Sequence, residues 1–99
     1  MKEYMAVVNL IPTGKENAIS RERLAELAKL PDRTVREHIE QARRDGWYII
    51  THAQRGGYYR TEDIDEIEYQ YRIDRARALS VLSRLKAMRR CLKDAGRKV

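Results

Sequence analysis

The 99-residue sequence has few of the residues that form cross-links, metal sites and catalytic centres. Its single cysteine, Cys91, cannot form an intrachain disulfide, and His38 and His52 do not stand at metal-ligand spacing from it. No serine stands in an arrangement with a histidine and an acid, and no glycine-rich phosphate loop is present. We therefore expect no catalytic residue, no metal, no cofactor and no small-molecule ligand, and we predict that the protein is not an enzyme.

Long apolar runs are also lacking. No stretch approaches the roughly 20 apolar residues of a membrane span, and the N-terminus has no charged segment followed by an apolar one, as a secretory signal would. These absences predict a cytoplasmic protein without membrane contact. What the chain has in excess is positive charge, with 21 Lys and Arg against 15 Asp and Glu. Such a balance favours a polyanionic partner, but many small proteins are basic. The inference therefore depends on where the charges lie in the sequence.

Helical periodicity begins near the N-terminus. The pattern predicts a short helix over residues 4–11, which a proline and a glycine end, and then a polar loop. A brief strand is expected at residues 18–19, after which Ser20 caps a second helix over residues 21–29. The spacing of the apolar residues predicts that this helix faces the core through Leu24, Leu27 and Ala28.

A tight turn separates the second helix from a third. Leu30 is expected to fill the core within this turn, and Pro31 suits a helix start, where its missing N–H would have no partner. Asp32 adds negative charge beside the positive end of the helix dipole. The third helix is therefore predicted over residues 32–45, with Gly46 as its C-terminal stop.

The periodicity changes after Gly46. Residues 47–51 and 58–60 predict two strands around a glycine turn, which is a β-hairpin. Thr61 is then expected to cap a long final helix that no glycine or proline interrupts before Gly96. The expected fold is mainly α with a small β-hairpin, with one domain at residues 1–60 and a long helix with a basic tail at residues 61–99.

Two short helices, a tight turn and a following hairpin occur in this order in winged helix-turn-helix domains. The stretch LAELAKLPDRTVREHIEQARRDG, followed by YYR after the glycine turn, resembles the winged helix-turn-helix regulators of bacteria and their prophages, including biotin-repressor-like domains. The resemblance covers about residues 4–60. The sequence departs from the family at Lys29, where a glycine commonly ends the second helix, and at Pro31, where a serine or threonine usually caps the third.

The third helix has one apolar and one charged face. At about 100° per residue, Val35, Ile39 and Ala42 converge on one side, and the opposite side is almost wholly charged. In a major groove, an arginine can bond guanine through two hydrogen bonds and a glutamate can accept one from cytosine. The alternative is an ordinary solvated face. Residues near the start of such a helix penetrate deepest, so the predicted base contacts are Arg33, Thr34, Arg36 and Glu37.

Other polar side chains are expected to contact the DNA backbone. Arg55 lies at the glycine-rich tip of the hairpin, and further candidates flank the hairpin or the helix ends. Trp47 and Tyr59 are expected to close the core rather than to stack on bases. The full set of predicted backbone contacts is Lys15, Ser20, Arg21, Arg44, Arg55 and Arg60.

The final helix has an apolar seam with alternating spacings of three and four residues, as in coiled coils. A helix of this length is too long for so small a domain to cover, so we expect a second copy as its partner; the alternative is a helix that folds back on its own domain. Asp74 is the polar member of the seam. The predicted dimer contacts are Ile64, Ile67, Tyr71, Ala78, Val81, Leu85, Met88 and Leu92.

Charge is unevenly distributed along this helix. Residues 61–75 carry six acids and two bases, and residues 76–99 carry eight bases and one acid. An antiparallel pair would match these halves, whereas a parallel pair would place like upon like. The same gradient also complements the helix dipole, so the sequence leaves the orientation open.

The sequence therefore predicts a protein that binds double-stranded DNA in a sequence-specific manner, as a transcriptional regulator of bacterial or prophage origin. A homodimer would place two recognition helices on half-sites related by its two-fold axis. The alternative is a protein–protein interaction module, such as a phage adaptor or inhibitor of host machinery, built on the same scaffold.

Overall fold

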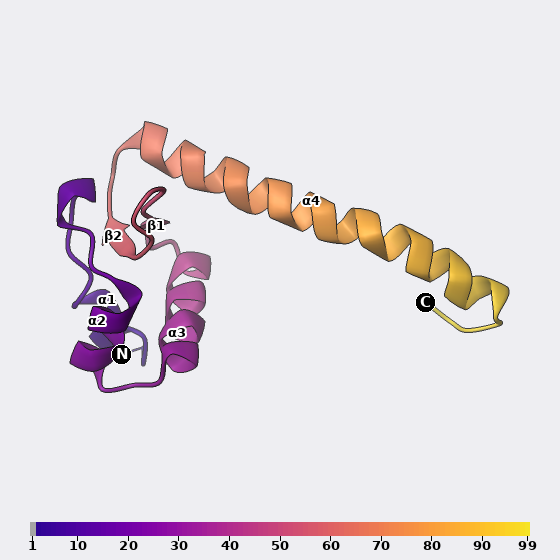
Figure 1. Ribbon diagram of the computed structural model, residues 1–99, viewed down its shortest axis with the longest axis horizontal. Coiled ribbons are helices and arrows are strands. Elements are labelled where there is room, and N and C mark those ends of the chain that lie inside the picture. The colour runs from indigo at the N-terminus through magenta and orange to yellow at the C-terminus, as the bar shows by residue number, and fades with distance from the viewer. Residues whose placement is uncertain (1) are drawn as a thin grey trace. The chain divides into compact units, whose positions relative to one another are not determined.

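The computed structural model describes residues 2–99 and has the expected class, mainly α with a small hairpin and a long C-terminal helix (Figure 1). It divides into an N-terminal unit, residues 1–67, and a C-terminal unit, residues 68–99. The elements in chain order are α1 (Met5–Val8), one turn of 3-10 helix (Lys15–Asn17), α2 (Arg21–Ala28), α3 (Asp32–Arg44), β1 (Ile49–Thr51), β2 (Tyr58–Arg60) and α4 (Ile64–Asp94).

The core of the N-terminal unit lies between α1, α2, α3 and the hairpin, and each pair of the three helices is in contact. α1 is shorter than the predicted helix, but its flanking residue Ile11 is still fully buried. The prediction for Leu27 was wrong: its side chain is 42% exposed, and Ala25 packs on the core with Ala28. The inward face of α2 is therefore formed by Leu24, Ala25 and Ala28. The largest fully buried side chains are Val7, Val8, Ile11, Leu24, Val35, Ile39 and Ile49.

The turn between α2 and α3 accommodates Lys29 and Pro31. Lys29 ends α2 in the left-handed conformation (φ 56°, ψ 41°) that a glycine usually supplies. The N–H of Leu30 then donates to the carbonyl of Ala25 at 3.3 Å. Pro31 is extended (ψ 148°) and directly precedes the first residue of α3. A left-handed lysine costs about 1–2 kcal/mol, which a domain of this size can offset.

The hairpin is extended by a third segment on its outer edge. β1 and β2 are antiparallel, with Ile50 opposite Tyr59. On the other side of β2, Ile19 and Tyr58 exchange two backbone hydrogen bonds of 2.8 and 2.9 Å, so the brief strand predicted at residues 18–19 is confirmed as a single bridge. β1 begins at Ile49, two residues later than predicted, because the N–H of Trp47 is bonded to Ala42 at the end of α3.

The start of α4 corrects the predicted cap. The carboxylate of Asp63 accepts hydrogen bonds from the N–H groups of Asp65 (2.8 Å) and Glu66 (3.4 Å), so Asp63 is the capping residue and the helix begins at Ile64. The hydroxyl of Thr61 accepts from the N–H of Asp63 and donates to Glu66 at 2.7 Å. Glu66 also accepts from the Tyr59 hydroxyl at 2.7 Å, which fixes the first turn of α4 to the end of β2.

α4 continues for 31 residues, and Gly96 (φ 80°) follows its end. Every residue from Asp74 to Val99 is exposed in the single chain. No helix among residues 2–99 has the combined length and apolarity that crossing a membrane requires.

Candidate nucleic-acid interface

α3 has the two faces that its sequence predicts. Val35, Ile39 and Ala42 are buried, with 2% or less of each exposed. On the outer side, the Arg33 and Arg36 side chains are 84% and 58% exposed, and Glu37 is exposed beside them. Thr34 is half-buried, so of the four predicted base contacts it is the least accessible.

The outward arginines of α3 are paired with acids on the same helix. Arg33 Nε lies 3.2 Å from Glu37 Oε1, and Arg44 Nη2 lies 2.7 Å from Glu40 Oε1, both at a spacing of four residues. Such exposed pairs typically contribute less than about 1 kcal/mol. A guanidinium group can therefore exchange its carboxylate for another acceptor at little cost.

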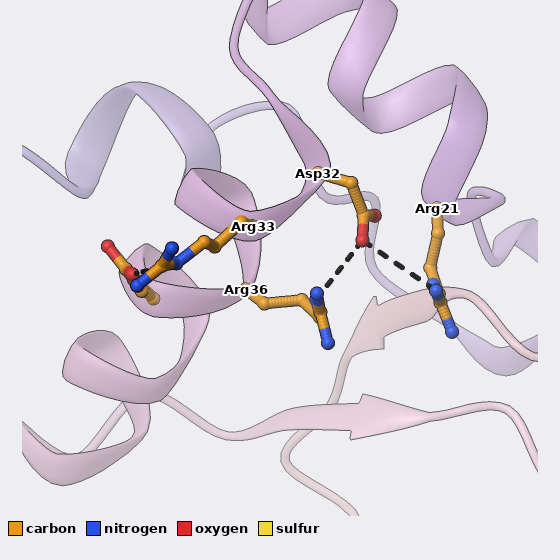
Figure 2. A network of polar contacts seen from close by, with 5 residues as sticks. Arg21, Asp32, Arg33 and Arg36 are labelled. Atoms are coloured by element: carbon orange, nitrogen blue, oxygen red, sulfur yellow. Dashed lines mark hydrogen bonds and ion pairs between the residues drawn. The ribbon is translucent and has the colours of Figure 1, made fainter.

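One acid connects α3 with α2. Asp32 Oδ2 lies 3.1 Å from Arg36 Nε and 3.7 Å from Arg21 Nη2, so the two guanidinium groups converge on one carboxylate (Figure 2). Arg21 is the first residue of α2 and Asp32 the first residue of α3. The N-terminal ends of both helices thus present their cations on one surface.

The predicted backbone-contact residues fall into two groups. Lys15, Ser20 and Arg55 are exposed, as are Arg21 and Arg44 with their ion pairs. Ser20 is also the predicted cap of α2, confirmed by a 3.1 Å hydrogen bond from the N–H of Arg23 to its hydroxyl. Arg60 differs from the others, because it is half-buried and its Nε donates to the carbonyl of Ile11 at 2.8 Å. This bond holds the segment after α1 against β2.

The tip of the hairpin is organised by His52. This side chain is buried, and its Nδ1 accepts the N–H groups of Gln54 (3.2 Å) and Arg55 (3.1 Å). A further bond runs from the N–H of Gly56 to the carbonyl of His52 at 3.0 Å. The turn therefore has a defined backbone from which Arg55 is exposed to solvent. Among residues 2–99, no acidic side chain pairs with Arg55.

Sequence reasoning missed the function of Arg43. Its Nε donates to the carbonyl of Ile49 at 2.9 Å, and its Nη2 donates to the Thr51 hydroxyl at 3.1 Å. Its guanidinium carbon also lies 6.0 Å from the ring centroid of Tyr58. Arg43 thus connects α3 to the hairpin, whereas Arg33, Arg36 and Arg44 are outward. The available signal was its position directly after the buried Ala42.

Net charge is concentrated outside the unit that carries this face. Residues 1–67 contain 11 Lys and Arg against 12 Asp and Glu, and residues 68–99 contain ten against three. The positive excess of the whole chain therefore belongs to the C-terminal unit. Any attraction of the N-terminal unit to a polyanion has to come from the local arrangement of its arginines.

Comparison with known proteins gave no relative: no protein-family model, curated protein or solved structure matches the chain.

Proposed function

We propose that the protein binds double-stranded DNA in a sequence-specific manner, with α3 in the major groove and the hairpin tip on the phosphate backbone. The observation that carries the proposal is the exposure of Arg33 and Arg36 on the side of α3 opposite its buried face. This is the arrangement that a recognition helix requires. In this proposal the protein acts by occupying its site, as a bacterial or prophage transcriptional regulator in the cytoplasm, and performs no chemistry.

The ion pairs of α3 define how DNA would be bound. Arg33 and Arg36 each exchange a carboxylate for guanine O6 and N7, and Glu37, released from Arg33, accepts a hydrogen bond from cytosine N4. Arg21, beside Asp32, then contacts a phosphate next to the base that Arg36 contacts. Each exchange replaces an exposed ion pair of low energy with a directional contact.

The test is selection of bound sequences from a random duplex library, followed by gel retardation of the selected site. Arg33→Ala with Arg36→Ala should abolish the difference in affinity between selected and scrambled duplexes and leave the circular dichroism spectrum unchanged. The matched control is Arg23→Ala with Arg72→Ala, which also removes two exposed, ion-paired arginines. Selectivity that survives in the first variant would remove α3 from this function.

Arg55 has a different expected effect. As an exposed, unpaired cation among residues 2–99, it fits a phosphate contact that carries no sequence information. Arg55→Ala should weaken binding to all duplexes about equally. A changed sequence preference would instead place Arg55 against the bases.

A second candidate is a protein–protein interaction module, such as a phage adaptor or inhibitor of host machinery. It is favoured by the near balance of charge in residues 1–67 and by the acids that pair with the arginines of α3. The two functions differ in salt dependence. Binding through about six phosphate contacts should fall by roughly 10³ between 50 and 200 mM salt, whereas a protein complex with an apolar centre should be much less affected.

A further inference from the structure

The C-terminal unit exposes a continuous set of large apolar side chains. Among residues 2–99, the buried part of the chain ends at Gln70, and beyond it leucine, valine and methionine side chains are 41–56% exposed. Monomeric proteins rarely expose so extended an apolar surface. The exposed members within α4 from residue 79 onward are Leu79, Val81, Leu82, Leu85, Met88 and Leu92.

Val81, Leu85, Met88 and Leu92 belong to a seam, and Leu79 and Leu82 lie beside it. Positions 64, 67, 71, 74, 78, 81, 85, 88 and 92 alternate by three and four residues over about four heptads. Ile64, Tyr71 and Asp74 are exposed, and Ile67 is half-buried. A seam of this period fits a second helix of the same period, because each side chain then enters a hole on the opposite helix.

We propose that the second helix is α4 of another copy of this chain and that the two helices run antiparallel. Residues 64–74 carry four acids and one base, and residues 84–94 carry five bases and one acid. These segments are equally distant from the centre of α4 at residue 79. An antiparallel pair places the acidic segment of each copy against the basic segment of the other. A parallel pair places acid on acid at one end and base on base at the other.

The residues that border the seam on α4 favour the same orientation. With Ala78 of one copy opposite Val81 of the other, Tyr71 lies opposite Met88, and Glu68 lies beside Arg89. Either orientation brings two pairs of like charges together: Arg77 and Arg84, once in each half of the antiparallel pair, or Arg84 and Arg89, twice at the same end of the parallel pair. Only the antiparallel pair adds the attraction between Glu68 and Arg89.

Asp74 fixes the register of this pair. It is the one polar side chain in the seam, and its carboxylate accepts a hydrogen bond from Gln70 at 2.9 Å. In the proposed register Asp74 faces Leu85 of the other copy in the layer next to the central Ala78–Val81 layers, once in each half of the pair. A polar residue at one layer lowers the stability of a coiled coil, but it also restricts the alignments available.

The orientation can be measured on the natural sequence, because Cys91 is its one cysteine and is exposed. A spin label on Cys91 lies about 12 residues from the centre of the proposed pair. Two labels should therefore be about 35 Å apart by pulsed electron paramagnetic resonance, at about 1.5 Å per residue. In a parallel pair they would lie side by side, within about 20 Å, given a helix spacing of about 8–10 Å. The short distance, or no dipolar coupling at all, would overturn the proposal.

Variants distinguish a true seam from a general effect of charge. Leu85→Asp with Leu92→Asp should give the monomer mass by light scattering and remove the long spin distance. The matched control, Ala76→Asp with Ser83→Asp, makes the same charge change at the same spacing on the opposite side of α4 and should keep the dimer mass. A dimer that persists in the seam variant would also overturn the proposal. Because DNA retardation is measured separately, the pairing and the proposed DNA binding can fail independently.

Discussion

Asp32 Oδ2 lies 3.1 Å from Arg36 Nε, and the same oxygen lies 3.7 Å from a guanidinium nitrogen of Arg21. One carboxylate at the start of α3 thus faces a predicted base contact and a predicted phosphate contact. In the free protein this acid stabilises the dipole of α3 and limits repulsion between the two arginines. In the proposed DNA complex the same negative charge would lie close to the phosphates. We therefore expect Asp32 to oppose the proposed binding that Arg21 and Arg36 favour.

Asp32→Asn is expected to strengthen DNA binding and to weaken the fold slightly. Removing the carboxylate should raise duplex affinity several-fold at low salt and lower the free energy of unfolding by about 0.3–1 kcal/mol. Gel retardation and urea denaturation measure the two effects. Glu3→Gln, at an exposed position, makes the same charge change and serves as the control. Equal affinity gains in both variants would show that only net charge matters.

Arg43 is expected to stabilise the fold rather than to contact DNA. Arg43→Met removes two hydrogen bonds to the hairpin and a cation–π contact, which should lower the free energy of unfolding by about 1–3 kcal/mol. Arg44→Met breaks only an exposed ion pair, and its expected effect is within about 0.5 kcal/mol. Thermal denaturation followed by circular dichroism compares the two variants. Similar melting temperatures would contradict the proposed function of Arg43.

The adjacent glycines of the hairpin turn should respond very differently to alanine. Both have positive φ, +70° at Gly56 and +77° at Gly57, so either substitution costs about 1–2 kcal/mol in backbone strain. A Cβ on Gly57 would lie 2.3 Å from the carbonyl oxygen of Ile19, whereas one on Gly56 would meet nothing within 4 Å. Gly57→Ala should therefore lower the free energy of unfolding by about 1–3 kcal/mol more than Gly56→Ala does, as measured by urea denaturation. Equal losses of unfolding free energy would show that the backbone at Ile19 can move away from the added Cβ at little cost.

Tyr4 should make stability depend on pH in the alkaline range. Its hydroxyl donates to Asp45 Oδ2 at 2.7 Å, and this bond, followed by burial, raises the pKa of Tyr4 above its usual value of 10.0. The unfolded chain therefore loses this proton at lower pH than the folded chain. The contribution is complete below pH 10 and is lost as pH rises through the higher folded pKa.

The comparison with Tyr4→Phe isolates this effect from other groups that titrate in the same range. The difference in unfolding free energy between the natural protein and the variant should be constant from pH 7 to 9 and shrink above pH 10. Urea denaturation at each pH measures it. A difference that stays constant to pH 11 would show that the bond to Asp45 does not hold the Tyr4 proton.

The sequence predicts α3 well because its evidence is local. Val35 and Ile39 follow the helical period, Asp32 and Gly46 mark the ends, and the structure confirms all four features. The capping residue of α4 is harder to predict from the sequence, because Thr61 and Asp63 are both good capping residues and lie two positions apart. Tertiary contacts decide between them: Glu66 accepts from Tyr59 and Thr61, which draws Thr61 into the junction and leaves Asp63 at the helix start.

The polar network of the candidate site depended on packing that periodicity does not reveal. The approach of Arg21 to Asp32 requires the mutual placement of α2 and α3, and the bonds of Arg43 require the position of the hairpin. The sequence predicted Arg21 as a contact of the DNA backbone but not its approach to Asp32, and it assigned no function to Arg43. The charge balance of residues 1–67, in contrast, could have been found by counting each half of the chain separately.

The hydrophobic cluster of the N-terminal unit is formed by residues between Tyr4 and Tyr58. Among residues 2–99, Gln70 is the one buried side chain after Thr61. Selection on α4 beyond this point is therefore largely free of constraints from that core. If α4 pairs with a second copy as proposed, insertions of whole heptads, or exchange of the seam residues, could change which copies associate without altering the outward face of α3. With the proposed dimer and DNA interface, partner choice and recognition could thus diverge separately in evolution within a chain of 99 residues.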